Sequence, residues 1–301
     1  MGGNRYLVPF NRGIATTSLR TGLAMTGNLE SARQIPISLS ADTECLPIGR
    51  TDFMLLTIQK AVYRFCRWLV WVFYPRITVE GAENLPEGPC LAVGNHAQMN
   101  GPITSVLYYP RKRKTWCAGQ MMKLKEVPAY AYQDFWSGKP RAVRWFYKML
   151  SYLIAPLCVC IFNHADTIGV WRDGRIINTF KQTMNALKEG ADVVIFPECN
   201  EEHNHIVHAF QENFTDVAKL YYKQTGEALP FVPIYVCPAL RKLVIGKPVY
   251  YDPQVPIASQ RHDLCEKLMD AITALAEALP EHTVVPYPNM PKREYPSSRT
   301  N

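Results

Sequence analysis

The chain has 301 residues, of which 48% are hydrophobic, 20% charged and 11% aromatic, and this composition excludes an intrinsically disordered chain. Its 33 Lys and Arg residues against 26 Asp and Glu residues give a formal net charge of +7, which favours an anionic partner. Because the basic residues form no long tract, we expect that partner to be a membrane surface or a phosphorylated substrate, and no nucleic acid.

The cysteines and the N-terminal residues indicate the cellular compartment of the protein. Nine cysteines are scattered along the chain without a C-x-x-C pair, a pattern typical of buried thiols in a reducing compartment. Residues 1–51 lack apolar periodicity, so we expect a mobile leader there, without the apolar core of a secretory signal. Because Glu30 is the first acidic residue, an organellar transit segment stays an alternative, as does a start codon assigned too early.

Residues 52–76 are predicted to form an amphipathic helix. Four polar or cationic residues form one narrow stripe at spacings of three, four and three: Thr57, Lys60, Arg64 and Arg67. Three cations in a bilayer would cost about 2.5–3.5 kcal/mol each, more than about ten apolar residues return at about 0.3–0.6 kcal/mol each. We therefore expect this helix to lie in the interface, on the cytoplasmic side of a membrane. Packing into its own domain is the alternative.

Three further apolar runs precede the middle of the chain. Residues 77–80 and 90–93 flank a turn-rich segment and are expected to form neighbouring strands. Residues 149–162 carry no charge but are too few for an ordinary membrane span. We predict that they form a buried helix that leads into a strand, with an addition to the apolar membrane-facing surface as the alternative.

Helices and strands then alternate. Strands are predicted over residues 193–196, 231–236 and 243–245. Two helices show apolar residues at helical spacing: Ile176, Phe180, Met184 and Leu187 in the first, and Leu264, Leu268, Ile272, Leu275 and Leu279 in the second. This alternation predicts an α/β domain over residues 77–285, with a mixed sheet flanked by helices, and a loose Pro-rich tail over residues 286–301.

Two polar segments directly follow apolar strands, where an α/β sheet usually builds its site. They are residues 95–101, with the sequence NHAQMNG, and residues 196–203, with the sequence FPECNEEH. Each segment alone is a weak signal, because a lone histidine in a loop is more often structural than catalytic.

Together with their surroundings, these segments resemble the motif blocks of the phospholipid and glycerol acyltransferase family. Asn95 and His96 match the start of its N-H-x-x-x-x-D motif. The resemblance covers roughly residues 79–249, and the other blocks follow in order: Gly169-Val170-Trp171-Arg172, Phe196-Pro197-Glu198 of an F-P-E-G block, Val232-Pro233-Ile234 and Gly246-Lys247-Pro248.

The resemblance implies an acyltransferase that moves a fatty acyl group from acyl-CoA or acyl carrier protein to a hydroxyl of a glycerophosphate or lysophospholipid. No cofactor is implied beyond the thioester co-substrate. His96 is then the general base, because an imidazole titrates near neutral pH. The residues implied to bind substrate are Asn95, Arg172, Pro197, Cys199 and Asn200, with Arg172 on the phosphate.

The sequence departs from the family pattern at the position of the motif Asp, which is Gly101 here. That Asp would hold the imidazole in the correct tautomer and stabilise imidazolium, and a change from carboxylate to amide in the analogous protease site costs about 10⁴ in rate. We expect Asn100 to fix the tautomer and a carboxylate of Glu198, Glu201 or Glu202 to supply the charge. The third block also departs, with Cys199 for Gly and Asn200-Glu201 for Thr-Arg.

Two other functions stay open. The first is a relative that binds lipid or acyl donor without turnover. The second is a metal-dependent hydrolase, whose ligands would come from one ten-residue stretch: Cys199, Glu201, Glu202, His203, His205 and His208. Their spacing fits no motif known to us, so we expect no metal.

Overall fold

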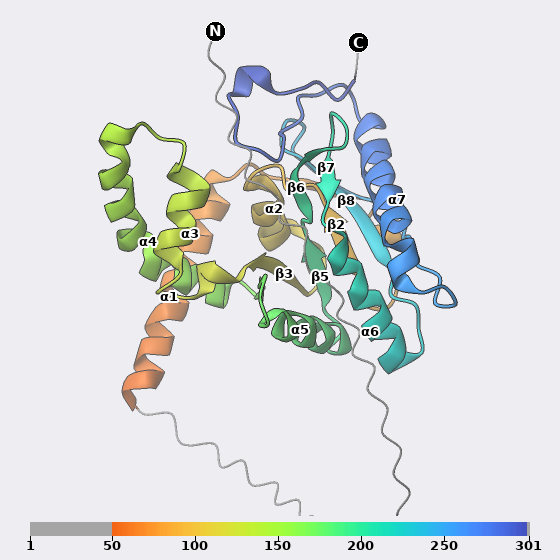
Figure 1. Ribbon diagram of the computed structural model, residues 1–301, viewed down its shortest axis with the longest axis horizontal. Helices are drawn as coiled ribbons and strands as arrows, with labels where there is room; N and C mark the ends of the chain where they lie inside the picture. The colour runs from red at the N-terminus through yellow and green to blue at the C-terminus, as the bar shows by residue number, and fades with distance from the viewer. Residues whose placement is uncertain (1–49, 300–301) are drawn as a thin grey trace, which may run out of the picture. The chain divides into compact units, whose positions relative to one another are not determined.

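The computed structural model describes residues 50–299, with side chains from Met54 onward (Figure 1). The leader expected over residues 1–51 lies outside the described residues except at its end, where helix α1 (Arg50–Phe73) begins. The remaining residues form a mixed seven-stranded sheet with helices on both faces and a second helical unit beside it. The predicted α/β fold with a mixed sheet is confirmed.

The sheet has the strand order β1-β9-β8-β2-β5-β3-β4. Five neighbouring strands are parallel, and β9 runs antiparallel to β8 while pairing in parallel with β1. The bounds are β1 (Thr78–Glu80), β2 (Leu91–Gly94), β3 (Arg113–Ala118), β4 (Thr167–Val170), β5 (Asp192–Ile195), β8 (Phe231–Cys237) and β9 (Lys242–Ile245). The expectation that β1 and β2 are neighbours is wrong, because β5 and β8 occupy both edges of β2.

Side chains of the central strands alternate between two apolar layers, as the two-residue period of a strand requires. Leu91 and Val93 of β2 face a cluster formed with helices α5 (Ile176–Lys188), α6 (Asp216–Thr225) and α7 (Ile257–Glu277). Ala92 faces the opposite cluster, which also contains Tyr109, just after helix α2 (Asn100–Tyr108). Burial on both faces explains why these strands are continuously apolar.

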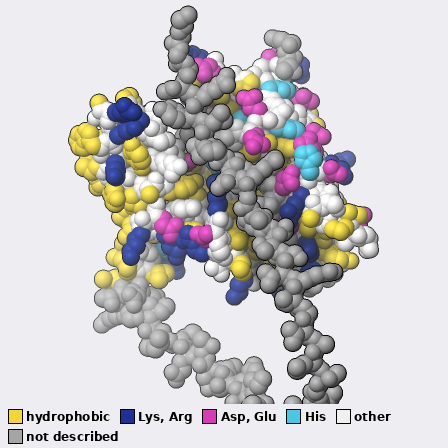
Figure 2. All heavy atoms as spheres, viewed as in Figure 1, with side chains coloured by type: hydrophobic (Ala, Val, Ile, Leu, Met, Phe, Trp, Pro, Cys, Tyr) yellow, Lys and Arg dark blue, Asp and Glu magenta, His cyan; other side chains and the backbone are white. Residues whose placement is uncertain are grey.

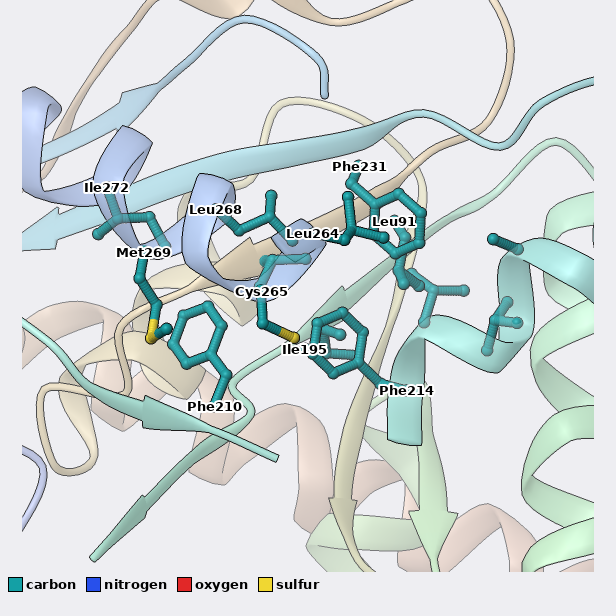
Figure 3. Packing of buried hydrophobic residues seen from close by; sticks show 14 of the residues in the cluster. Leu91, Ile195, Phe210, Phe214, Phe231, Leu264, Cys265, Leu268, Met269 and Ile272 are labelled. Atoms are coloured by element: carbon teal, nitrogen blue, oxygen red, sulfur yellow. The ribbon is translucent and has the colours of Figure 1, made fainter. Parts of the chain in front are cut away.

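The predicted helices α5 and α7 are confirmed. Figure 3 shows Leu264, Leu268 and Ile272 of α7 among the buried residues around Leu91 and Ile195. The chain after α5 turns at Gly190, whose φ of 71° lies in the left-handed region that glycine adopts without strain. A separate antiparallel hairpin, β6 (Glu198–Glu202) and β7 (His208–Phe210), follows β5.

A second helical unit consists of α1, α3 (Val127–Ala131), the π-helical segment η3 (Tyr132–Trp136) and α4 (Arg144–His164). The prediction of a buried helix over residues 149–162 is wrong. Those residues belong to α4, which leads towards β4 as expected but contacts mainly α1, α3 and η2 (Gly119–Met122), and most of its side chains are not buried. An apolar run therefore marks a surface here, not a core.

A buried ionic network joins the ends of three strands. The Asp192 carboxylate at the start of β5 is 1% exposed and accepts hydrogen bonds from the backbone N–H of Cys90 (3.0 Å) and the hydroxyl of Tyr109 (2.8 Å). Arg111 donates to both of its oxygens, at 2.9 Å from Nε and 2.7 Å from Nη2. Burial and the neighbouring Cys90 and Asp192 raise the pKa of the Tyr109 hydroxyl far above its usual value, so it stays a donor.

Candidate active site

His96 lies in the loop between the end of β2 and the start of α2. The next two residues, Ala97 and Gln98, have φ values of 43° and 56°, an uncommon left-handed conformation for residues other than glycine. The turn is closed by hydrogen bonds from Asn100 N to Ala97 O (3.1 Å) and from Gly101 N to His96 O (2.9 Å). It brings the Gln98 carbonyl back onto the His96 ring.

The contact between His96 Nδ1 and the Gln98 carbonyl oxygen fixes the tautomer of the imidazole. A carbonyl only accepts hydrogen bonds, so Nδ1 carries the proton and Nε2 is left as an acceptor. Burial lowers the pKa of His96, while the Gln98 carbonyl and the Asp134 carboxylate act in the opposite direction. The ring is therefore neutral at neutral pH, as a general base has to be.

Asn100 does not hold the imidazole, contrary to our expectation. Its amide nitrogen donates to Ala97 O (2.9 Å), and its amide oxygen accepts from the hydroxyl of Tyr74 (3.0 Å), which also lies 3.1 Å from Thr104 Oγ1. Both ends of the amide are thus engaged away from the ring. The Gln98 backbone carbonyl takes the role that sequence reasoning assigned to Asn100.

Gly101 is buried at the start of α2, and the space around it explains the absent Asp. A Cβ atom at this position would lie 2.7 Å from the carbonyl oxygens of both Asn95 and His96, and 2.8 Å from Phe196 Cε1. Two of these three contacts are with backbone, which a rotamer change cannot relieve. The loop conformation that turns Gln98 onto His96 thus excludes a side chain at residue 101.

Gly101→Asp, which restores the family pattern, is expected to damage this protein. Forcing a side chain into a packed site costs typically about 1–3 kcal/mol, and the loop has to move to admit it. We expect a fall in the free energy of unfolding of that order, measured by urea denaturation, and no gain in catalytic rate. Gly138→Asp is the matched control, because a Cβ atom there has nothing within 4 Å. A faster enzyme of unchanged stability would contradict this account.

The Glu198 carboxylate joins two separate segments of the chain by hydrogen bonds. Glu198 is 3% exposed and accepts the backbone N–H of His96 and the backbone N–H of His208, the latter at 2.9 Å. Burial raises its pKa to about 7, although both hydrogen bonds lower it. The Glu198 carboxylate bonds to the backbone of His96 and not to its ring, and Glu201 and Glu202 are exposed on β6. The contacts therefore do not show the role that we expected of these glutamates, which was to stabilise the charged form of the His96 ring.

Asp134, in η3, is a carboxylate whose charge acts on the pKa of His96 without a direct contact. Burial raises the pKa of Asp134 while His96 lowers it, and Asp134 in turn works against the lowering of the His96 pKa. Sequence reasoning missed Asp134, since it belongs to none of the motif blocks and lies far along the chain.

Two aromatic rings stand edge-on to the imidazole. The centroid of Phe196 lies 5.6 Å from that of His96, and the centroid of Tyr287 lies 5.7 Å away. Burial raises the pKa of Tyr287, the charges of Asp134, Glu198 and Cys199 add to this, and Arg172 opposes it. Three predicted site residues, Arg172, Glu198 and Cys199, are therefore close enough to act on a ring that touches His96.

Tyr287 belongs to the segment that we expected to be a loose tail, and the structure differs there. Gln98 Nε2 donates to the hydroxyl of Tyr295 (3.0 Å) and to Pro288 O (3.4 Å), which joins this segment to the His96 loop. Val284 N also donates to Pro296 O (2.9 Å). High proline content indicates extended backbone but does not say what it packs against.

The other residues predicted to bind substrate differ in access. Asn95 is 2% exposed, and its amide accepts Val236 N (2.7 Å) and donates to Val236 O (3.1 Å), so it fastens the loop to β8. Pro197 is buried, and its carbonyl accepts Gln211 N (2.9 Å). Arg172 and Asn200 are exposed and Cys199 is half-buried, so these three are the ones that a substrate can reach.

Two of the three histidines considered as metal ligands have separate partners. His203 Nδ1 lies 3.8 Å from Glu266 Oε1, and His205 Nε2 lies 3.2 Å from Ser298 O. His208 Nδ1 is buried and has no hydrogen-bond partner among the residues that the structure describes. Within residues 50–299, no three His, Cys, Asp or Glu side chains are grouped so that they could hold a metal ion.

Comparison with known proteins gives a remote likeness to a solved structure. No family model matches the chain, and no curated protein matches it. Among solved structures, the chain is similar to the 1-acyl-sn-glycerophosphate (LPA) acyltransferase PlsC from Thermotoga maritima, with 16% sequence identity, a TM-score of 0.40, and coverage of 73% of this chain and 79% of that chain. A likeness of this size carries no functional argument, so the function has to be derived from the site.

Proposed function

We propose that the protein is a membrane-surface acyltransferase, which moves a fatty acyl group from the thioester of acyl-CoA or acyl carrier protein to a hydroxyl of a glycerophosphate or lysophospholipid. The observation that supports this most is the placement of the His96 ring, which is half-buried just after the carboxyl end of β2. Its Nδ1 is hydrogen-bonded to the Gln98 carbonyl oxygen, which leaves Nε2 as the acceptor. The motif order along the sequence supports the same reaction class.

In the proposed reaction, His96 Nε2 takes the proton of the acceptor hydroxyl while the hydroxyl oxygen attacks the thioester carbonyl carbon. The resulting tetrahedral intermediate collapses by breaking the carbon–sulfur bond. The thiolate leaves and receives the proton from the imidazolium, so the histidine returns to its neutral form. Asp134 stabilises the transient imidazolium through space, in place of the missing motif carboxylate.

Arg172 is the proposed contact for the acceptor phosphate. Its guanidinium is exposed and lies within electrostatic reach of Tyr130 and Tyr287, the second of which touches the His96 ring. A planar guanidinium binds phosphate oxygens in pairs, which would fix the acceptor hydroxyl relative to the base. Cys199 and Asn200 are the other accessible candidates for substrate contact.

The proposed membrane residence rests on helices α1 and α4, and the proposed cytoplasmic side rests on the free cysteines of the described residues. Large apolar side chains are exposed along α1, among them Phe65, Trp68 and Phe73. Of the residues that the structure describes, Arg141–His164 form one helix apolar enough to cross a membrane, and only 17% of its most apolar window is buried. Its charge-free run, residues 149–162, is about 21 Å long at 1.5 Å per residue, shorter than a hydrocarbon core of about 30 Å. We therefore propose peripheral binding within one leaflet.

The proposal is tested by following release of free thiol from a fatty acyl thioester, with and without a hydroxyl acceptor. Thiol release that requires a lysophospholipid or glycerophosphate, with the acylated acceptor as product, is the expected result. Equal release without acceptor would identify a hydrolase instead. Saturable acyl-CoA binding with no thiol release for any acceptor would favour the relative without turnover.

A further inference from the structure

A cavity of about 660 Å³ lies between η3 and α4, and His96 is not among the residues that line it. Tyr132, Gln133 and Ser137 line one side of it, and Arg144, Trp145 and Lys148 line the other. The π-helical turn of η3 places these side chains differently from a regular α-helix, and such turns are frequent at functional sites. The proposed acyl transfer makes no use of this cavity.

The charges of the cavity are of one sign. Arg144 and Lys148 are four residues apart, so they lie on the same face of α4. No lining residue is acidic, and within residues 50–299 neither cation takes part in an ion pair. Side chains of Gln133, Ser137 and Tyr132 add hydrogen-bond donors. This combination is complementary to a phosphate group.

The cavity continues into an exposed apolar stripe, which points to a lipid. Trp145, Met149, Leu153 and Leu157 recur every four residues along α4, and all four are exposed, Trp145 by 69% and Leu153 by 68%. The stripe is about 18 Å long at 1.5 Å per residue, close to the depth of one leaflet, which is about half of a 30 Å hydrocarbon core. Figure 2 shows hydrophobic side chains, with Lys and Arg among them, gathered over this helical unit at the left.

The two cations lie at one end of an apolar stripe that is about as long as one leaflet is deep. A phospholipid has the same arrangement, because its phosphate lies at the interface and its acyl chains lie in the hydrocarbon below. We infer that the cavity between η3 and α4 binds the phosphate of an anionic phospholipid in the leaflet that α4 enters, as an anchor separate from the acceptor site. This inference rests on the proposed membrane residence. It does not depend on acyl transfer.

The test measures binding of the full chain to vesicles of phosphatidylcholine alone and of phosphatidylcholine mixed with phosphatidylglycerol. The double variant Arg144→Gln, Lys148→Gln should bind the anionic vesicles about 30-fold more weakly, because each cation near such a surface contributes a factor of about five. Binding to phosphatidylcholine alone should weaken much less, because the charge of its phosphate is balanced by the choline group. The control Lys181→Gln, Lys188→Gln removes the same charge from exposed positions on α5 and should leave both affinities unchanged.

A second variant separates a built site from general attraction to the surface. Ala129→Trp fills the cavity from α3 without altering charge, and it should also remove the preference for phosphatidylglycerol. Equal losses in the α5 control, or an unchanged preference in both cavity variants, would overturn the inference. Thiol release with soluble substrates, measured without vesicles, reports the proposed acyl transfer separately, so failure of one does not imply failure of the other.

Discussion

Replacing His96 with alanine is expected to lower acyl transfer by about 10² to 10⁴, the usual contribution of a positioned general base. The ring is held by the Gln98 carbonyl and lies between Phe196 and Tyr287, so Nε2 has one orientation in which to take a proton. Truncation removes this acceptor and leaves the substrate contacts in place. We therefore expect kcat to fall with little change in KM, measured by thiol release.

His262→Ala is the matched control, because His262 is exposed on α7, where its Nδ1 lies 3.1 Å from Glu212. It should leave turnover unchanged. Thermal unfolding of both variants shows whether the fold survives, and the His96 variant should unfold in the same cooperative way as the parent protein. Undiminished turnover in a folded His96→Ala protein would exclude His96 as the base. Asp134→Asn then tests the charge partner on its own.

Replacing Asp192 with alanine is expected to lower the free energy of unfolding by about 3–5 kcal/mol, the usual cost of removing one member of a buried ion pair. The change leaves Arg111 without its carboxylate, and it leaves the backbone N–H of Cys90 and the hydroxyl of Tyr109 without acceptors. These groups lie just before β2, just after α2 and just before β3, so the loss affects the central strands of the sheet where they begin. Urea denaturation at neutral pH gives the measurement.

Glu189→Ala provides the comparison, because Glu189 forms an exposed ion pair with Lys112 at 3.7 Å only three residues away. Exposed pairs contribute about 0–1 kcal/mol, so this variant should unfold almost like the parent protein. If both variants lost the same small amount of stability, the Asp192 network would not hold the strand ends together as described.

Most of the fold was predictable because its elements carry local patterns. Helix α7 shows one apolar residue per turn, and β8 reads as a continuous apolar run. Strand pairing was not predictable in the same way, because the short apolar runs of β1 and β2 do not indicate which strands they pair with. In the structure β1 pairs with β9, and β2 pairs with β8 and β5. The apolar run in α4 was assigned to a core because periodicity does not distinguish a buried apolar face from an exposed one.

The site was predictable only where a side chain itself carries the chemistry. His96 and Glu198 were found from their motif blocks, and the structure brings them into contact. The orientation of the imidazole depends on a backbone carbonyl, that of Gln98, and residue identity does not reveal where a carbonyl points. The Tyr287 ring lies against the imidazole and the charge of Asp134 acts on its pKa. Both residues come from distant parts of the chain, so no local spacing indicates them.

Strands β3 and β4 are parallel neighbours, with Cys117 paired to Gly169, and the whole excursion through α3, η3 and α4 connects them. Parallel neighbours need a long crossover in any case, and lengthening a loop adds little entropy cost. This crossover carries both the stripe proposed to enter lipid and Asp134, whose charge acts on the pKa of His96. A single insertion between two strands thus links the proposed membrane contact to the electrostatics of the proposed base.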